Sequence, residues 1–174
     1  FLNIINEWYA KDTSKKIKAV AKAKGESGKH LTTNPPYGYM KDPNDKSHWI
    51  IDEDAAKVVR EVFDLCVKGY GPSQISNILK DKHILSPASY YKSKGLPQRT
   101  LKSDETDDCY WSETVISRML EKEEYIGNTV NFRTYKKSYK SKKHLWNDKD
   151  KWLVFKNTQE PIIDENTFNI VQNI

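Results

Sequence analysis

Apolar residues recur at helical spacing in two short stretches near the middle of the chain. The segment Gly71–Leu79 predicts a short helix opened by a cap at Ser73, and Trp111–Leu120 predicts a second helix capped by Ser112. The apolar face of the second helix consists of Val115, Ile116, Met119 and Leu120. Its opposite face carries short polar and basic side chains, so we expect one side of this helix to be buried and the other to be exposed.

The start of the chain predicts a longer helix, from Phe1 to about Lys24. An apolar stripe marks its first half and consists of Leu2, Ile5, Trp8 and Tyr9. Its second half is rich in lysine and alanine, and Gly25 and Gly28 are placed to end it. This pattern is typical of a helix that leaves one packed body and crosses to another surface.

Between these helices, turn residues at 42–45 separate two aromatic runs, which predicts a hairpin. Asp52 or Asp54 is then placed to cap a helix that ends at Gly69 and Gly71. The predicted buried face of this helix consists of Ala55, Val58, Val59, Val62, Phe63 and Cys66. Four aromatic residues beside apolar runs are expected in the core, namely Tyr37, Tyr39, Trp49 and Trp111.

The remaining segments complete the predicted fold. Residues 86–110 have the composition of a loop and form an insert between the two short helices. The runs 125–132 and 152–155 predict a strand pair with the basic segment 133–151 as its mobile tip, and Asp164 is placed to cap a final helix. The pattern therefore predicts a mainly α fold with small antiparallel β hairpins (α+β), containing a helix-turn-helix-like unit with an insert between its two helices.

Charge is distributed unevenly along the 174 residues, which carry a net charge of +5 and have a pI near 9.0. Basic residues gather at 11–29 and 133–143, whereas acidic residues gather at 52–54 and 104–108. Separated blocks of charge give a polarised surface, and the basic side of such a surface favours a polyanion. Nucleic acid is therefore the expected class of partner.

Little else in the sequence points to chemistry. Cys66 and Cys109 provide neither a disulfide framework nor paired metal ligands, so a reducing cytoplasm is favoured. No apolar run approaches the length of a membrane span, and no signal peptide is apparent. The four histidines lack ligand spacing, and Ser86 and Ser112 have no base near them in sequence. We therefore expect no cofactor, no bound metal, no catalytic residue and no membrane partner.

Several short motifs occur in a specific order and spacing. They are Pro36-Tyr37-Gly38-Tyr39, the helix from Asp54-Ala55 to Phe63 with Gly69 after it, Ile75–Leu79, Trp111 with Val115–Leu120, Tyr125-Ile126-Gly127, and Pro161-Ile162-Ile163-Asp164. Together they resemble the recombinase domain of the large serine recombinases, which include serine integrases and transposon-borne relatives. The resemblance extends over nearly the whole chain.

The resemblance implies that residues 1–30 are the end of a long linker helix and an extended linker from a resolvase-like catalytic domain before Phe1. That missing domain would hold the serine nucleophile. Residues 31–174 would be the recombinase DNA-binding domain, and the zinc-ribbon domain that usually follows it would be absent, so no zinc is expected. The chain would then be a non-catalytic, monomeric fragment that binds duplex DNA at a recombination half-site and meets other protomers through its missing domains.

Four groups of side chains are candidates for DNA contact. On the helix after Ser112, the candidates for contact with the major groove are Thr114, Ser117, Arg118 and Lys122, with Arg118 suited to guanine or phosphate. On the first helix, the candidates for contact with the DNA backbone are Lys15, Lys18 and Lys22. In the extended segment 25–33, the candidates for contact with the minor groove are Lys29, His30 and Thr32. In the basic segment 133–151, the candidates for contact with phosphates are Arg133, Lys136 and Lys137.

Other interpretations of the same residues stay open. The polar face of the helix after Ser112 is also typical of a solvated helix face, and the lysines of 15–29 are also typical of a soluble linker. The chain could be a freestanding helix-turn-helix transcription regulator, an enzyme that cleaves phosphodiesters itself, or a domain that binds only protein. DNA binding at low salt, nicking of plasmid DNA, and the open reading frame before Phe1 discriminate between them.

Overall fold

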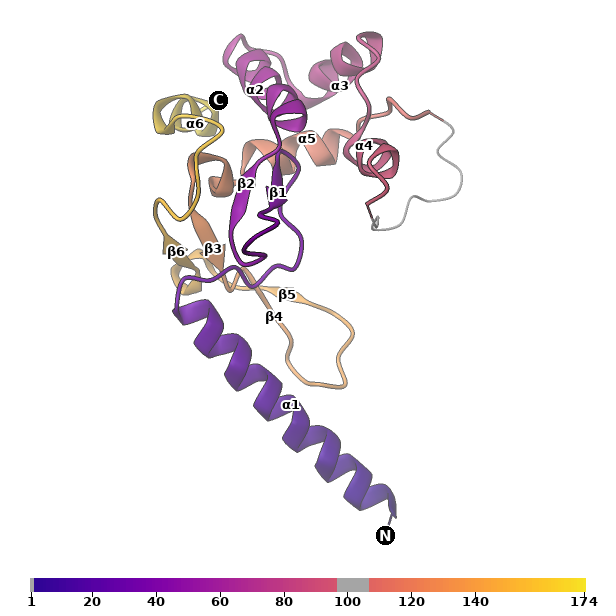
Figure 1. Cartoon of the computed structure of the whole chain (residues 1–174), viewed down its shortest axis with the longest axis vertical. Helices are drawn as coiled ribbons and strands as arrows, with labels where there is room; N and C mark the ends of the chain where they lie inside the picture. Colours follow the sequence, from indigo (N-terminus) through magenta and orange to yellow (C-terminus); the bar gives the residue numbers. More distant parts are fainter. Residues whose placement is uncertain (1, 97–106) are drawn as a thin grey trace.

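The computed structural model describes residues 2–96 and 107–174, in which one long helix projects from a body of short helices and strand pairs (Figure 1). The α-helices are α1 (Leu2–Glu26), α2 (Glu53–Val67), α3 (Pro72–Asp81), α4 (Pro87–Ser93), α5 (Glu113–Leu120) and α6 (Glu165–Gln172). The strands are β1 (Tyr39–Lys41), β2 (Trp49–Ile51), β3 (Thr129–Asn131), β4 (Thr134–Tyr135), β5 (Leu145–Trp146) and β6 (Leu153–Phe155). Two short 3₁₀ turns are η1 (Glu123–Ile126) and η2 (Lys149–Lys151).

The strands form three antiparallel pairs, β1–β2, β3–β6 and β4–β5. Tyr39 lies opposite Ile51 in the first pair, and Val130 lies opposite Val154 in the second. Both pairs were expected from the sequence. The predicted class, mainly α with small antiparallel β hairpins, is confirmed.

The core lies where α2 meets α3, α5 and α6. Val59, Val62 and Phe63 of α2 are fully buried there, and Cys66 is also buried, as the helical spacing predicted. The four aromatic residues expected inside are buried too, namely Tyr37, Tyr39, Trp49 and Trp111. The Tyr37 ring meets the rings of Tyr90 and Trp111 edge to face, whereas the Tyr39 ring is tilted against Trp49 and stacked on Tyr125. Such contacts stabilise aromatic clusters beyond the area they bury.

Helix α1 makes little contact with this body, and Figure 1 shows it extending away from the strand pairs. Gly25 is its one buried residue in the described range. The predicted apolar stripe is exposed by more than half at each position, namely at Leu2, Ile5, Trp8 and Tyr9. The buried contacts of α1 are therefore confined to its C-terminal end, and its contacts with the hairpin 133–151 are exposed.

Several local expectations are wrong. The residue that caps α3 is Gly71, whose N–H donates to the Gln74 side chain at 2.9 Å, and Ser73 lies inside the helix. The predicted loop 86–110 contains α4, which Ser86 caps by accepting a hydrogen bond from the Ser89 N–H. The segment 133–151 holds the β4–β5 pair, so it is partly ordered as a hairpin.

The caps of the other helices follow the sequence more closely. Asp164 caps α6, and its carboxylate accepts a hydrogen bond of 2.9 Å from the Thr167 N–H. Asp52 and Ser112 occupy the N-cap positions of α2 and α5, although neither side chain makes a capping bond. The Asp52 carboxylate instead accepts a hydrogen bond from the Tyr90 hydroxyl at 2.8 Å, which ties α2 to α4.

Candidate nucleic-acid interface

Helices α3 and α5 pack against each other although more than thirty residues separate them in sequence. The Ser76 hydroxyl on α3 donates to the carbonyl of Trp111, the residue just before the α5 cap position. The Trp111 indole N–H donates to the Ile84 carbonyl at 3.0 Å, so the segment after α3 also contacts the segment before α5. Ser76 and Trp111 are both buried, and bonds between buried groups fix the orientation of α5 on α3.

The orientation of α5 leaves a narrow polar face in solvent. Ile116, Met119 and Leu120 are buried, whereas Thr114 and Arg118 are exposed and Ser117 is half-buried. Val115 was expected in the core but is 39% exposed, because the helix contacts the body along a narrower stripe than the sequence pattern suggested. The helix also ends at Leu120, which places Lys122 just beyond it.

Arg118 differs from the other arginines in the described part of the chain. Arg60 pairs with Glu53 at 3.1 Å, and Arg133 pairs with Glu124 at 2.9 Å. Arg118 has no acidic partner among the described residues, and its side chain is exposed. An exposed guanidinium without an internal partner keeps its five N–H donors for an external acceptor.

Charges of both signs meet at the C-terminal end of α5, where Arg118 and Lys122 are followed by Glu123 and Glu124 and separated by Glu121. Burial lowers the pKa of the Lys122 ammonium, and the cations Arg133 and Arg118 act in the same direction. Glu124 opposes this effect through its negative charge.

Helix α1 presents a basic surface. Lys15, Lys18 and Lys22 are exposed, and their spacing of three and four residues places them on one side of the helix. Lys22 forms a long ion pair of 3.7 Å with Glu26, which is worth little at a solvent-exposed site. All three ammonium groups are therefore accessible to an external anion.

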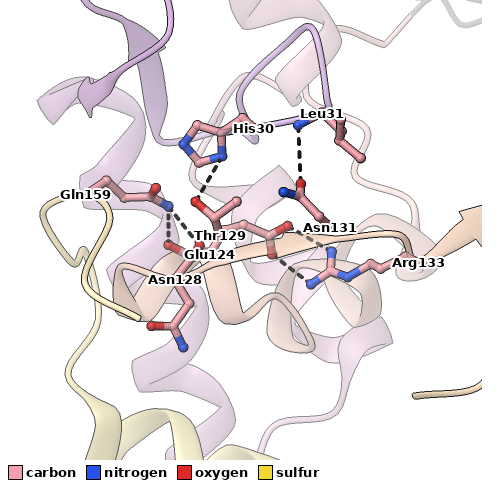
Figure 2. A network of polar contacts seen from close by, with 8 residues as sticks. All are labelled: His30, Leu31, Glu124, Asn128, Thr129, Asn131, Arg133 and Gln159. Carbon is pink, nitrogen blue, oxygen red and sulfur yellow. Dashed lines mark hydrogen bonds and ion pairs between the residues drawn. The ribbon is translucent and has the colours of Figure 1, made fainter. Parts of the chain in front are cut away.

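The linker after α1 folds onto β3 instead of extending as expected (Figure 2). Lys29 and Thr32 are exposed, but His30 is buried and only 8% of it is accessible. Its ring stacks on Trp49 with 3.4 Å between ring centroids, and its Nδ1 is hydrogen-bonded to the Thr129 hydroxyl. Burial lowers the pKa of His30 to about 4, which keeps the ring neutral at pH 7. His30 is thus placed as a core residue and does not face outward to read a groove.

Arg133 likewise has an internal role. Its two terminal nitrogens donate to the two carboxylate oxygens of Glu124, each at 2.9 Å, and Figure 2 shows the paired groups. Its guanidinium also lies 5.3 Å from the centre of the Trp152 ring. A guanidinium held by a bidentate ion pair and an aromatic face is not free to follow phosphates. Lys136 and Lys137, farther along the hairpin, are exposed.

Within residues 2–96 and 107–174, no group of three or more His, Cys, Asp or Glu side chains is arranged to hold a metal ion. Of the helices in these ranges, none has the length and apolar character needed to cross a bilayer.

Comparison with known proteins gives the family. The family model described as Recombinase matches residues 53–174. The chain belongs to the recombinase family. No curated protein matches it.

Two solved structures resemble the recombinase chain. One, described as "Crystal Structure of a LSR-DNA Complex", is 21% identical over 91% of this chain and 36% of that chain, with a TM-score of 0.48. The other, described as "Sequence Requirements of the Listeria innocua prophage attP site", is 23% identical over 92% of this chain and 49% of that chain, with a TM-score of 0.38. The recombinase chain thus spans less than half the length of either protein.

Some residues that organise this recombinase surface had no signal in the sequence. Asn131 and Glu124 are buried polar residues that hold the linker and Arg133 in place. Their partners lie up to 106 residues away along the chain. The run 125–132 also contains Asn128 and Thr129, so its pattern does not single out Asn131, although a buried amide requires hydrogen-bond partners.

Proposed function

We propose that this chain binds duplex DNA at one half of a recombination site, as the DNA-binding part of a serine recombinase. The observation that carries the proposal is the docking of α5 on α3, which leaves Arg118 exposed and without an acidic partner among the described residues. A short helix held on a second helix, with one polar face in solvent, fits the dimensions of a major groove. Membership of the recombinase family makes a DNA site the expected partner.

Each part of the surface has a proposed role. Thr114, Ser117 and Arg118 contact base edges, and Lys122 contacts a nearby phosphate. Exposed lysines of α1 and the hairpin contact the DNA backbone, and they are Lys15, Lys18, Lys22, Lys136 and Lys137. Lys29 and Thr32 face the minor groove between these regions. His30 and Arg133 are left out of this set because their side chains have partners inside the protein.

The chemistry of strand exchange is assigned to a part of the parent protein outside these residues. We propose that a serine nucleophile in that part cuts and rejoins DNA, while this chain sets its position on the site. The chain itself is proposed to act as a cytoplasmic monomer, with other recombinase protomers joined through the missing domains. The family match favours this function over that of a freestanding transcription regulator.

A direct test is the binding of labelled duplex DNA at increasing salt. The logarithm of the association constant should fall linearly with the logarithm of salt concentration, because each contacted phosphate releases counterions. A plasmid incubated with the chain and magnesium should stay supercoiled, which separates binding from cleavage. Absence of any shifted band at low salt would contradict the proposal and favour a domain that binds only protein.

A further inference from the structure

The loop that joins α1 to the body is held by one buried side chain. The Asn131 amide nitrogen donates to the Gly25 carbonyl at 3.1 Å and to the Lys29 carbonyl at 2.9 Å. The Asn131 amide oxygen accepts a hydrogen bond of 3.2 Å from the Leu31 N–H, as Figure 2 shows. Two carbonyls need a donor and one N–H needs an acceptor, so a primary amide satisfies all three groups at once.

Close packing restricts the same loop. A Cβ added at Gly25 would lie 2.3 Å from the Cζ atom of Phe132, so the ring leaves no room for a side chain where α1 ends. Gly28 adopts a φ of +81°, and a Cβ there would lie 3.2 Å from the Phe155 ring. The end of α1 therefore has few alternative positions, since protein interiors resist small displacements.

The hairpin also contacts α1, through side chains at the surface. Lys136, Ser138 and Tyr139 border a groove along α1 residues 9–18, and the Tyr139 hydroxyl donates to Glu7 at 3.5 Å. Lys140 of the hairpin pairs with Glu7 at 2.6 Å, but both side chains are at least 60% exposed. An exposed ion pair of this kind contributes little free energy and is screened by salt. The loop contacts at Asn131 thus outweigh the hairpin contact in deciding the direction of α1.

We propose that Asn131 is a positioning residue, which fixes the angle at which α1 leaves the body. Through that angle it places Lys15, Lys18 and Lys22 along the DNA backbone while α5 occupies its groove. The placement of the lysines along DNA rests on the proposed function, whereas the fixed angle of α1 concerns the protein alone. A preorganised α1 binds with less loss of conformational freedom than a helix that pivots freely.

The first experiment measures the angle without DNA. Spin labels are placed at Lys18→Cys on α1 and Lys57→Cys on α2, in a Cys66→Ala, Cys109→Ser background, and their separation is measured by pulsed electron resonance. The parent protein should give one narrow distance distribution, and Asn131→Ala should give a clearly broader one. A narrow distribution at the parent distance in a folded Asn131→Ala protein would overturn the proposal.

Matched variants separate positioning from general destabilisation. Asn128→Ala also removes a buried amide, but this side chain points away from the linker (Figure 2), so the distribution should stay narrow. Lys140→Ala should likewise leave the distribution unchanged. If Asn131→Ala does not fold, Gly25→Ala decides the matter: it should displace the peak, and an undisplaced peak would overturn the proposal.

The second experiment measures duplex binding. Asn131→Ala should weaken binding about tenfold, and this loss should disappear when Lys15, Lys18 and Lys22 are all replaced by alanine, because the effect acts through α1. A loss that persists in the triple-alanine background would contradict positioning through α1. Failure of the parent protein to bind DNA would contradict the proposed function alone, since the distance measurement does not depend on DNA.

Discussion

The arginines show how the surroundings of a residue change its role. Arg60 pairs with the exposed Glu53 and Arg133 pairs with the buried Glu124, whereas Arg118 has no acidic partner in the described residues. The sequence alone does not distinguish the roles of these three arginines, because an acidic neighbour such as Glu124 can be identified only in the folded chain. Arg133 was predicted to contact phosphate, but its half-buried guanidinium is held by the bidentate pair with Glu124.

Arg118 carries a direct prediction. Arg118→Ala should cost about 1–3 kcal/mol of binding free energy at the preferred site if the guanidinium reads a base. The loss should be smaller on unrelated duplexes, and titrations on both DNAs measure the difference. Lys57→Ala, which removes an exposed cation on α2, is the control. An equal loss on both DNAs would assign Arg118 to a phosphate.

His30 makes stability depend on pH. Its pKa is about 4 in the folded chain against 6.5 in the unfolded chain, so the unfolded state takes up a proton first as the pH falls. The contribution of neutral His30 to the free energy of unfolding is then fully present above pH 6.5 and is lost as the pH falls towards 4. The loss is about 2 kcal/mol at pH 5. Urea unfolding at pH 7 and pH 5 measures this loss. His30→Gln should remove most of the pH dependence, and an unchanged dependence would show that other groups cause it.

At the scale of elements, most of the helices and strands that were predicted correctly were predicted from amphipathic periodicity and aromatic runs. Helix α2 has a strongly apolar face, and the aromatic runs around 42–45 form the β1–β2 pair. Helix α4 was missed although Ser86 followed by Pro87 is an ordinary start signal, because the polar composition of 86–110 outweighed it. The linker was misjudged for another reason: its hydrogen bonds go to Asn131, about a hundred residues away.

The docking of α3 on α5 can be tested through Ser76. Ser76→Ala leaves the buried Trp111 carbonyl without that donor, which should cost about 1–3 kcal/mol of unfolding free energy. Ser73→Ala is the matched control in the same helix, since Ser73 is exposed and does not cap it. Its effect should stay within about 0.5 kcal/mol. Urea titrations of both variants provide the values, and equal losses would contradict the role given to Ser76.

At the scale of the whole molecule, the two regions proposed to contact DNA differ in character. One lies around α5 on the packed body, and the other lies along α1, which projects from that body (Figure 1). The charge block at 11–29 predicted the basic surface of α1, and the amphipathic pattern of 111–120 predicted the polar face of α5. Their relative placement depends on tertiary contacts at the end of α1. In the proposed function, a helix that projects in this way adds phosphate contacts without adding to the core.

The contribution of α1 should appear in the salt dependence of binding. Replacing Lys15, Lys18 and Lys22 by alanine should make the slope of log association constant against log salt shallower by roughly 3, because each phosphate contact contributes about 0.9. Replacing Lys57 on α2 and Lys68, the residue just after α2, is the control and should leave the slope unchanged. The unfolding free energy of the triple variant should match that of the parent, since all three lysines are exposed. An unaltered slope in the triple variant would remove α1 from the interface.

The central claim is that α5 and α1 contact one DNA half-site together. Selection of bound sequences from a random duplex library, followed by footprinting of the best site, tests this claim most directly. We predict a preferred sequence in which α5 protects a segment of the major groove. Next to this segment, the DNA backbone should also be protected, and this second protection should depend on Lys15, Lys18 and Lys22. Recovery of no preferred sequence, or a footprint that Arg118→Ala and the triple lysine variant both leave unaltered, would contradict the account.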